Sequence, residues 1–252
     1  MIVSATIIAT NYNMTTAKWD DCHHYSPAPR HRRRLMNRII DKLDFNSVID
    51  VGCAQPYLIE EMIKKRPAIR ICGCDVAEPV IEQNRKMFPQ AGFEVVDIGS
   101  GQYPANETFN LVVCSEVLEH VNDWQKALAN LAAMSDRYIL ITVPCGKVFP
   151  IDKMMGHYRH YNGAELIAEL ERNDCQVLYK RNWGFPIHTL YKYLINSFSP
   201  NKIYKSFSES RYGWSKKVLS NLIYIGFYIN DLFRSGGQFI ILAKKCNSEK
   251  ES

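Results

Sequence analysis

Two carboxylates and an imidazole stand close together in the chain, at a spacing that suits either proton transfer or metal binding. Glu116, Glu119 and His120 occupy positions i, i+3 and i+4, so a helical turn would place the three side chains on one face. An imidazole titrates near neutral pH and can accept the proton of a hydroxyl group. We therefore predict His120, the later His157 and Glu119 as catalytic residues that act without a metal. The alternative is a divalent ion held by Glu116, Glu119, His120 and His157.

A second set of residues has the pattern of a ligand-binding turn. Residues 48–58 read as a buried strand, a tight turn and the start of a helix. Gly52 would let the backbone approach a ligand closely, and Pro56 suits a first helical turn, where no amide donor is needed. Asp75 and Asp97 each follow a later apolar strand, where an aspartate can also serve as a simple turn former. Ligands of open α/β sheets bind at such strand ends.

The elements that must position these residues are short apolar strands separated by segments of helical length. We expect strands at 48–51, 69–74, 93–96, 111–114, 138–143, 176–179 and 238–243. Helical spacing is found at 35–43 and 163–172. This alternation predicts an α/β fold with a doubly wound, seven-stranded and mostly parallel sheet.

The order of these motifs resembles that of the class I, Rossmann-like S-adenosylmethionine-dependent methyltransferases. Asp50 and Gly52 match the start of the first motif of that family, D-x-G-x-G-x-G, whereas Ala54 and Pro56 replace later glycines. A dehydrogenase would instead keep G-x-G-x-x-G. Asp75 corresponds to the acidic residue that accepts hydrogen bonds from the ribose hydroxyls. The resemblance implies S-adenosylmethionine as cofactor, bound by Asp50, Gly52, Cys53, Ala54, Asp75, Val76, Asp97, Ile98, Ser115 and Glu116.

The E-x-x-E-H pattern is similar to that of the ubiquinone-pathway O-methyltransferases and the small-RNA 2′-O-methyltransferases. Those enzymes use it, with a later histidine that His157 matches here, to hold a divalent ion. Many similar methyltransferases carry the same residues without a metal. The resemblance therefore implies O-methylation, with bound Mg²⁺ or Mn²⁺ as the alternative.

The domain organisation follows from the positions of the strands. We expect an N-terminal arm at 1–34, a cofactor-binding core at 35–182, a helical substrate cap at 183–235 inserted before the last strand at 236–246, and a disordered tail at 247–252. The cap would contain helices at 190–198 and 217–233. In methyltransferases of this fold the arm and the late insertions usually select the acceptor. We predict as acceptor-binding residues Tyr25, Arg30, Arg159, His160 and Trp183.

A basic run from Arg30 to Arg34 bears on the class of acceptor. Guanidinium groups pair well with phosphate, so we expect a small polar acceptor: a sugar, a nucleotide sugar or a phosphate-bearing metabolite of surface-glycan or secondary-metabolite biosynthesis. The same run could bind RNA, or it could be a solvated start of a helix. The alternatives to the small acceptor are RNA 2′-O-methylation and a non-catalytic partner protein that binds S-adenosylmethionine.

Composition excludes several classes of protein. Hydrophobic residues make up 46% and charged residues 23% of the 252 residues, as in ordinary globular chains. The eight cysteines are dispersed without C-x-x-C pairs, which suits a reducing cytoplasm and argues against structural zinc. We expect no export signal and no transmembrane segment. Polar residues interrupt the apolar segment 218–233, which could be cap core, a contact in a homodimer or a membrane-surface helix; nucleic acid is not an expected partner.

Overall fold

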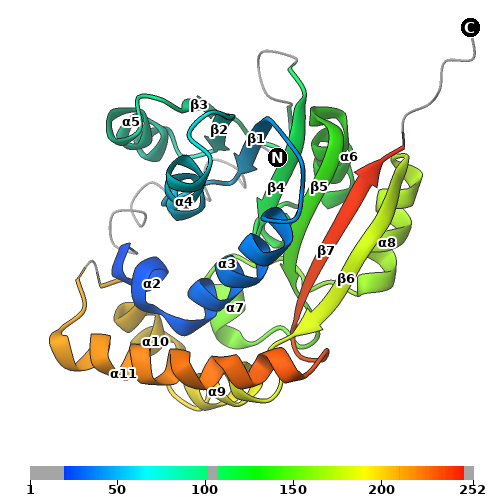
Figure 1. Cartoon of the computed structure of the whole chain (residues 1–252). Coiled ribbons are helices and arrows are strands. Elements are labelled where there is room, and N and C mark those ends of the chain that lie inside the picture. Colours follow the sequence, from blue (N-terminus) through cyan, green and yellow to red (C-terminus); the bar gives the residue numbers. More distant parts are fainter. Residues whose placement is uncertain (1–19, 102–106, 210, 247–252) are drawn as a thin grey trace, which may run out of the picture.

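A seven-stranded sheet forms the centre of the structure, a computed structural model that describes residues 20–101, 107–209 and 211–246. The strand order is β3-β2-β1-β4-β5-β7-β6, and only β7 runs antiparallel to its neighbours. Helices cover both faces of the sheet (Figure 1). The predicted fold class is confirmed, whereas the predicted tail at 247–252 lies outside the described residues.

The strands align at the edge where the candidate site lies. Their bounds are β1 Ser47–Val51, β2 Arg70–Asp75, β3 Gly92–Val95, β4 Phe109–Ser115, β5 Ser135–Pro144, β6 Cys175–Trp183 and β7 Gln238–Lys245. In the register, Val51 of β1 pairs with Cys74 of β2 and with Cys114 of β4. The residues that follow these three positions, Gly52, Asp75 and Ser115, are therefore brought to one edge of the sheet.

Each face of the sheet is covered by amphipathic helices. Apolar residues of α3 (Pro27–Ile40), α4 (Tyr57–Lys65) and α5 (Glu78–Met87) pack on one face. Those of α6 (Trp124–Met134) and α8 (Gly163–Arg172) pack on the other. Burial of these apolar stripes stabilises the helices more than their intrinsic propensity does.

The N-terminal arm differs from the prediction because its described part is helical. After α2 (Asp20–Tyr25), helix α3 begins at Pro27 rather than at residue 35, so the expected boundary after residue 34 falls inside a helix. Pro27 and Pro29 lie in the first turn of α3, where a missing amide hydrogen costs nothing. The guanidinium of Arg34 lies over the ring of Tyr228, at 3.6 Å from its centroid. The basic run therefore lies within a helix that packs on the protein.

The insertion before the last strand is helical, as predicted, but the helix Pro200–Phe207 was not predicted, and the helix expected at 217–233 is divided into two elements. The insertion consists of α9 (Ile187–Asn196), α10 (Pro200–Phe207), α11 (Trp214–Gly226) and the 3₁₀ helix η3 (Phe227–Leu232). Figure 1 shows these helices along the bottom of the molecule. In the part of the chain that the structure describes, no helix combines the length and the apolar character needed to cross a bilayer.

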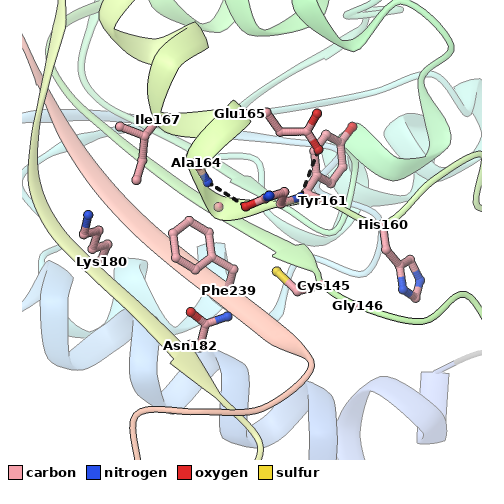
Figure 2. A pocket seen from close by; sticks show the side chains of 12 residues that line it. Cys145, Gly146, His160, Tyr161, Ala164, Glu165, Ile167, Lys180, Asn182 and Phe239 are labelled. Carbon is pink, nitrogen blue, oxygen red and sulfur yellow. Dashed lines mark hydrogen bonds between the residues drawn. The ribbon is translucent and has the colours of Figure 1, made fainter.

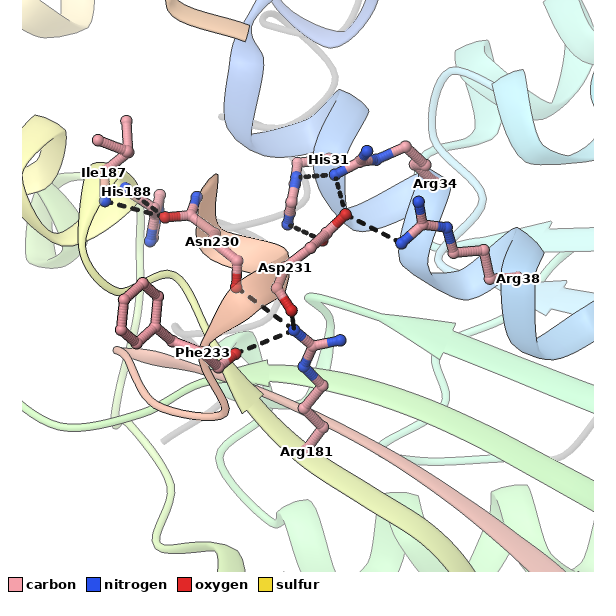
Figure 3. A network of polar contacts seen from close by, with 9 residues as sticks. All are labelled: His31, Arg34, Arg38, Arg181, Ile187, His188, Asn230, Asp231 and Phe233. Atoms are coloured by element: carbon pink, nitrogen blue, oxygen red, sulfur yellow. Dashed lines mark hydrogen bonds and ion pairs between the residues drawn. The ribbon is translucent and has the colours of Figure 1, made fainter. Parts of the chain in front are cut away.

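A polar network, which we call the α3–η3 network, ties the insertion to the core (Figure 3). Oδ2 of Asp231 in η3 lies 3.0 Å from Arg34 Nη2 and 2.9 Å from Arg38 Nη1, and its Oδ1 lies 3.6 Å from His31 Nε2. Arg181 of β6 donates to the backbone oxygen of Asp231 at 2.9 Å. Asp231 thus connects η3 to α3 through its carboxylate and to the edge strand β6 through its backbone oxygen.

Candidate active site

Two adjoining cavities lie over the carboxyl ends of β1, β2 and β4. The first cavity has a volume of about 300 Å³ and the second a volume of about 320 Å³. Gly52, Glu116 and His120 line both of them. All ten predicted cofactor-binding residues line one cavity or the other.

The first cavity combines two carboxylates with apolar walls. Asp75 is buried, and its carboxylate accepts hydrogen bonds from the amides of Ala54 and Ala77, each at 3.0 Å. Burial raises the pKa of Asp75 despite these bonds. Asp97 Oδ1 accepts a hydrogen bond from the amide of Gly99 at 2.9 Å, which orients the carboxylate. This arrangement suits a ligand that presents hydroxyl or amine donors beside a flat apolar group.

The loop after β1 keeps a tight turn although it lacks the later glycines of the family motif. Gly52 has a φ of +71°, and a Cβ on it would lie 2.3 Å from a methyl carbon of Val117. Ala54 also has a left-handed φ, of 36°, and its carbonyl accepts a hydrogen bond from Asn84 Nδ2 at 3.0 Å. Pro56 precedes the first residue of α4. The replacement of glycine at position 54 therefore leaves the left-handed turn in place, at the cost of local strain.

Asp50, the fourth residue of β1, is a buried residue of the sheet that borders the second cavity. Burial, together with the neighbouring charge of Asp75, raises its pKa to about 7. At neutral pH its carboxyl is therefore divided between the protonated and ionised forms, and a cationic ligand in the cavity would favour the ionised form.

Glu116 is directed toward helix α3 and not toward the histidines. It has a left-handed φ of 57° and precedes the 3₁₀ helix η2 (Leu118–His120). Its Oε2 lies 3.2 Å from Nη1 of Arg32, and its Oε1 accepts a hydrogen bond from the hydroxyl of Thr142 at 3.3 Å. The expectation that Glu116, Glu119 and His120 share one helical face is wrong, because only one short turn forms and Glu116 lies outside it.

Glu119, His120 and His157 do come together. Each offers a ligand atom within 4.8 Å of the others, and the two imidazole centroids are 4.7 Å apart. Burial lowers the pKa of His120 to about 4 and, with the neighbouring His120, that of His157 to about 2, so both rings are neutral at neutral pH. Glu119 is fully buried, and neither carboxylate oxygen has a hydrogen-bond partner in the described structure. Burial and the charge of Glu116 raise the pKa of Glu119 well above its usual value.

His160 lies behind His157 and does not face the second cavity. Its Nε2 is 3.3 Å from His157 Nδ1 and 3.4 Å from Asp152 Oδ2. Asp152, in α7 (Pro150–Met154), also pairs with Lys192 of α9 at 3.1 Å. These contacts fix the orientation of the His157 ring and connect it to the insertion.

The other predicted acceptor-binding residues lie away from both cavities. Trp183 is fully buried between the rings of His31 and His188, so its predicted contact with an acceptor is replaced by core packing. Arg30 donates to Asn221 of α11 at 2.7 Å. Lys217 lies over the ring of Tyr25, and Arg159 pairs with Glu165 at 2.8 Å.

Several residues that line the second cavity were missed by the reasoning from sequence. They come from α2, α3, α7, α10 and the loop after α7: His23, Arg32, Arg33, Met154, Met155 and Tyr204. Arg32 and Arg33 belong to the basic run noted in the sequence, but its spacing does not tell which arginines face the cavity. Met154, Met155 and Tyr204 carry no signal in the sequence, because their place at the site depends on how α7 and α10 pack together.

A third hollow, of about 690 Å³, lies beside α8 on another part of the molecule (Figure 2). Lys180 and Asn182 of β6, Phe239 of β7 and Cys145 line it. Among the predicted site residues only His160 borders this hollow, and in Figure 2 its ring is directed away from the other labelled side chains. The residues with candidate chemistry therefore gather at the first two cavities.

Comparison with known proteins also points to methyltransferases. The malonyl-[acyl-carrier protein] O-methyltransferase of Acetivibrio thermocellus is 26% identical over 105 residues, which are 40% of this chain and 37% of that protein. The ubiquinone biosynthesis O-methyltransferase of Vibrio campbellii is 28% identical over 143 residues, 54% of this chain and 57% of that protein. Neither match spans two thirds of the relative's own length.

A solved structure extends the likeness of fold to nearly the whole chain. It is the crystal structure of magnesium protoporphyrin IX methyltransferase from Synechocystis PCC 6803 with bound S-adenosylmethionine, with a TM-score of 0.61, 12% identity, and coverage of 98% of this chain and 99% of that one. A family model for a methyltransferase domain matches residues 28–181, which contain β1 to β5 and most of the lining of both cavities. The chain therefore belongs to the family of methyltransferase domains, as its resemblance to the class I S-adenosylmethionine-dependent enzymes implied.

Proposed function

We propose that this protein transfers the methyl group of S-adenosylmethionine to a hydroxyl group of a small acceptor. The observation that carries the proposal is the meeting of two unlike cavities at Gly52, Glu116 and His120. The first cavity, with Asp75 and Asp97, fits the nucleoside part of the cofactor. The second cavity has neutral imidazoles on its wall and fits an acceptor.

The chain's own residues have three tasks in this reaction. Bound S-adenosylmethionine supplies an electrophilic methyl group, so the protein must hold the acceptor oxygen in line with it. Gly52 lets the backbone pass close to the cofactor, and Glu116 is held in place by Arg32. His157 or His120, neutral at pH 7, accepts the proton of the acceptor hydroxyl. The buried carboxyl of Glu119, whose raised pKa favours the protonated form, lies beside both imidazoles and positions the ring that accepts the proton.

For the acceptor, we propose a sugar, a nucleotide sugar or another phosphate-bearing metabolite, as in surface-glycan or secondary-metabolite biosynthesis. Arg32 and Arg33 line the second cavity, where they also lie beside Glu116 and Glu61, and an anionic group of an acceptor can reach their guanidinium groups from the cavity. Arg30, Arg34 and Arg38 contact Asn221 or Asp231 of the insertion instead. Part of the basic run is therefore engaged in contacts within the protein. An exposed basic run was the main support for RNA as the acceptor, and that support is removed.

A metal-assisted version of the reaction is the second candidate. One carboxylate and two imidazoles form a donor set that divalent ions bind, and the buried carboxylate of Glu119 has no other partner in the described residues. Glu119, His120 and His157 would hold Mg²⁺ or Mn²⁺, and Glu116 would not, because it pairs with Arg32. Such an ion would lower the pKa of an acceptor hydroxyl.

Cofactor binding is tested first, by calorimetry with S-adenosylmethionine. We expect Asp75→Asn to weaken binding on the order of tenfold, because a charged acceptor of hydrogen bonds becomes an amide. Asp44→Asn is the matched control, since the side chain of Asp44 is 93% exposed and far from the cavities. If the wild type does not bind the cofactor at millimolar concentration, the proposed function is wrong.

Methyl transfer is then measured as release of S-adenosylhomocysteine with sugars, nucleotide sugars and phosphorylated metabolites as acceptors. We expect His157→Ala and Glu119→Gln to lower kcat at least tenfold while cofactor affinity is kept. A loss of wild-type activity on adding a chelator would select the metal-assisted version. Cofactor binding without turnover of any acceptor would instead support a non-catalytic partner protein.

A further inference from the structure

The outer face of the insertion exposes an unusual amount of apolar surface. Along α11 and η3, exposed apolar residues follow one another in steps of three or four positions: Trp214, Val218, Leu222, Ile225, Ile229 and Leu232. Trp214 is 81% and Leu232 79% exposed. Leu190, Leu194 and Phe198 form a second exposed row along α9 and just past its end. Contiguous apolar surface of this kind marks an interaction site.

The exposed apolar rows lie on the sides of α9 and α11 that do not pack on the rest of the protein. On α9, His188 is buried against Trp183 and Phe227 of η3. On α11, Ser220 is buried, and Tyr224 stacks with the guanidinium of Arg30 in α3. Each helix therefore has one side bonded to the core and an opposite apolar side that no described residue covers. Figure 1 shows both helices at the outer boundary of the molecule, below the sheet.

The charge of the insertion indicates what covers this face. Residues 183–235 contain seven lysines and arginines and two acidic residues, a net charge of +5, which equals the net charge of the whole chain. Of the two acidic residues, Asp231 is engaged in the α3–η3 network and Glu209 pairs with Lys216. The remaining exposed cations form no ion pair with any described residue: Lys202, Lys205, Arg211 and Arg234. The rest of the chain is neutral overall, so the net positive charge of the chain belongs to the same insertion as the exposed apolar rows.

We propose that the outer face of the insertion, formed by the exposed sides of α9, α11 and η3, docks on a membrane surface that contains anionic lipids. Amphipathic helices with apolar and aromatic residues on one side and cations beside them lie in the headgroup region of such a surface. Each lysine or arginine near an anionic leaflet adds about 1 kcal/mol of attraction. A second copy of the chain fits less well, because a symmetric contact would bring the same cations together.

Docking is tested by sedimentation with vesicles, and it does not depend on methyl transfer. We expect the full chain to sediment with vesicles of phosphatidylcholine and phosphatidylglycerol, to sediment much less with phosphatidylcholine alone, and to be released by salt. Equal sedimentation with both kinds of vesicle, or none with either, would overturn the proposal.

Two double variants locate the contact. Leu222→Ser with Ile225→Ser should lower the partition coefficient on the order of tenfold, because the apolar groups that enter the interface are removed. Lys202→Glu with Lys205→Glu should lower it at least about thirtyfold, from about 1 kcal/mol for each lysine. The controls are Met87→Ser and the pair Lys42→Glu with Lys86→Glu, exposed residues near the opposite side of the sheet. We expect the controls to bind as the wild type does.

The same variants decide between a membrane and a second copy. Thermal unfolding followed by circular dichroism should show that each variant is folded, since all substituted side chains are exposed. Analytical ultracentrifugation without lipid should show the same mass for the wild type and for Leu222→Ser with Ile225→Ser. A wild-type dimer that this double variant converts to a monomer would mean that the face binds its own copy, and the proposal would be overturned.

Discussion

At Gly52 the backbone turns with a φ of +71°, and Val117 approaches from the loop after β4. Both features act on the same position: the first disfavours any side chain, and the second fills the space that a Cβ would need. Asp75 completes the turn by accepting the amide hydrogen of Ala54. The geometry of the loop after β1 therefore depends on Gly52 and on the hydrogen bond to Asp75 more than on the number of glycines.

We predict that Gly52→Ala weakens the binding of S-adenosylmethionine by about thirtyfold or more. The new methyl group would displace Val117 and strain the turn, which together cost about 2 kcal/mol or more. Gly101→Ala is the matched control, because a Cβ on Gly101 meets nothing within 4 Å. Calorimetry measures both affinities, and an unchanged affinity of Gly52→Ala would contradict the assigned position of the cofactor.

The residues predicted for the cofactor all line one of the two cavities, whereas none of the five residues predicted for the acceptor lines either. Gly52, Asp75 and Ser115 follow strands whose register fixes where their ends meet, so a local pattern suffices. Trp183 and Arg30 were expected at the acceptor but belong to the packing between α3 and the insertion. Which side of an inserted helix faces a cavity is set by long-range contacts, and no short pattern encodes these.

At the scale of elements, helix α3 contacts both the candidate active site and the insertion. Its Arg32 reaches Glu116 beside the cavities, whereas Arg34 and Arg38 bind Asp231 of the insertion. The helical pattern at 35–43 revealed only its second half. The first half is hidden in the sequence because its charged residues find partners in η3 and in the loop after β4, which lie far along the chain.

We predict that Asp231→Ala lowers the free energy of unfolding by about 2 kcal/mol. The substitution leaves Arg34, whose side chain is mostly buried, and the more exposed Arg38 without their common partner. Asp44→Ala removes a carboxylate that is 93% exposed and pairs with Arg137, and should cost at most about 0.5 kcal/mol. Denaturation by urea compares the two variants; equal effects would show that the α3–η3 network adds no stability.

At the scale of the whole molecule, the alternation of strands and helices was sufficient to predict the sheet. Parallel strands buried on both faces give continuous apolar runs, which are visible in the sequence. The helix α10 was missed because its eight residues are too few for a helical period to stand out in the sequence, and none of its side chains is completely buried. The insertion packs on the rest of the protein through other helices, at contacts that include the buried His31 and His188. Because protonation of buried histidines is unfavourable, we expect acid to lower the stability of the protein.

We predict that the protein loses stability as the pH falls from about 7 toward 4. Burial holds the pKa of His188 at about 3 and that of His31 at about 4, below the value of 6.5 in an unfolded chain. The unfolded chain therefore takes up protons first, so this contribution is present above pH 6.5 and is lost below it. Between pH 7 and pH 5, His188→Gln should lose about 2 kcal/mol less than the wild type. Urea titrations at both pH values measure this, and parallel losses would contradict the assignment.

The α3–η3 network also sets an order of events during synthesis. Arg38 and Asp231 are 193 residues apart, which a ribosome needs roughly 10 to 40 s to translate. The strands β1 to β5 are made earlier in that interval, whereas the arginines of α3 have no carboxylate partner in η3 until residue 231 has been made. The contacts between α3 and η3 therefore form only after the strands β1 to β6 have been made, and a nascent chain that stops short of residue 231 would leave those arginines without this carboxylate.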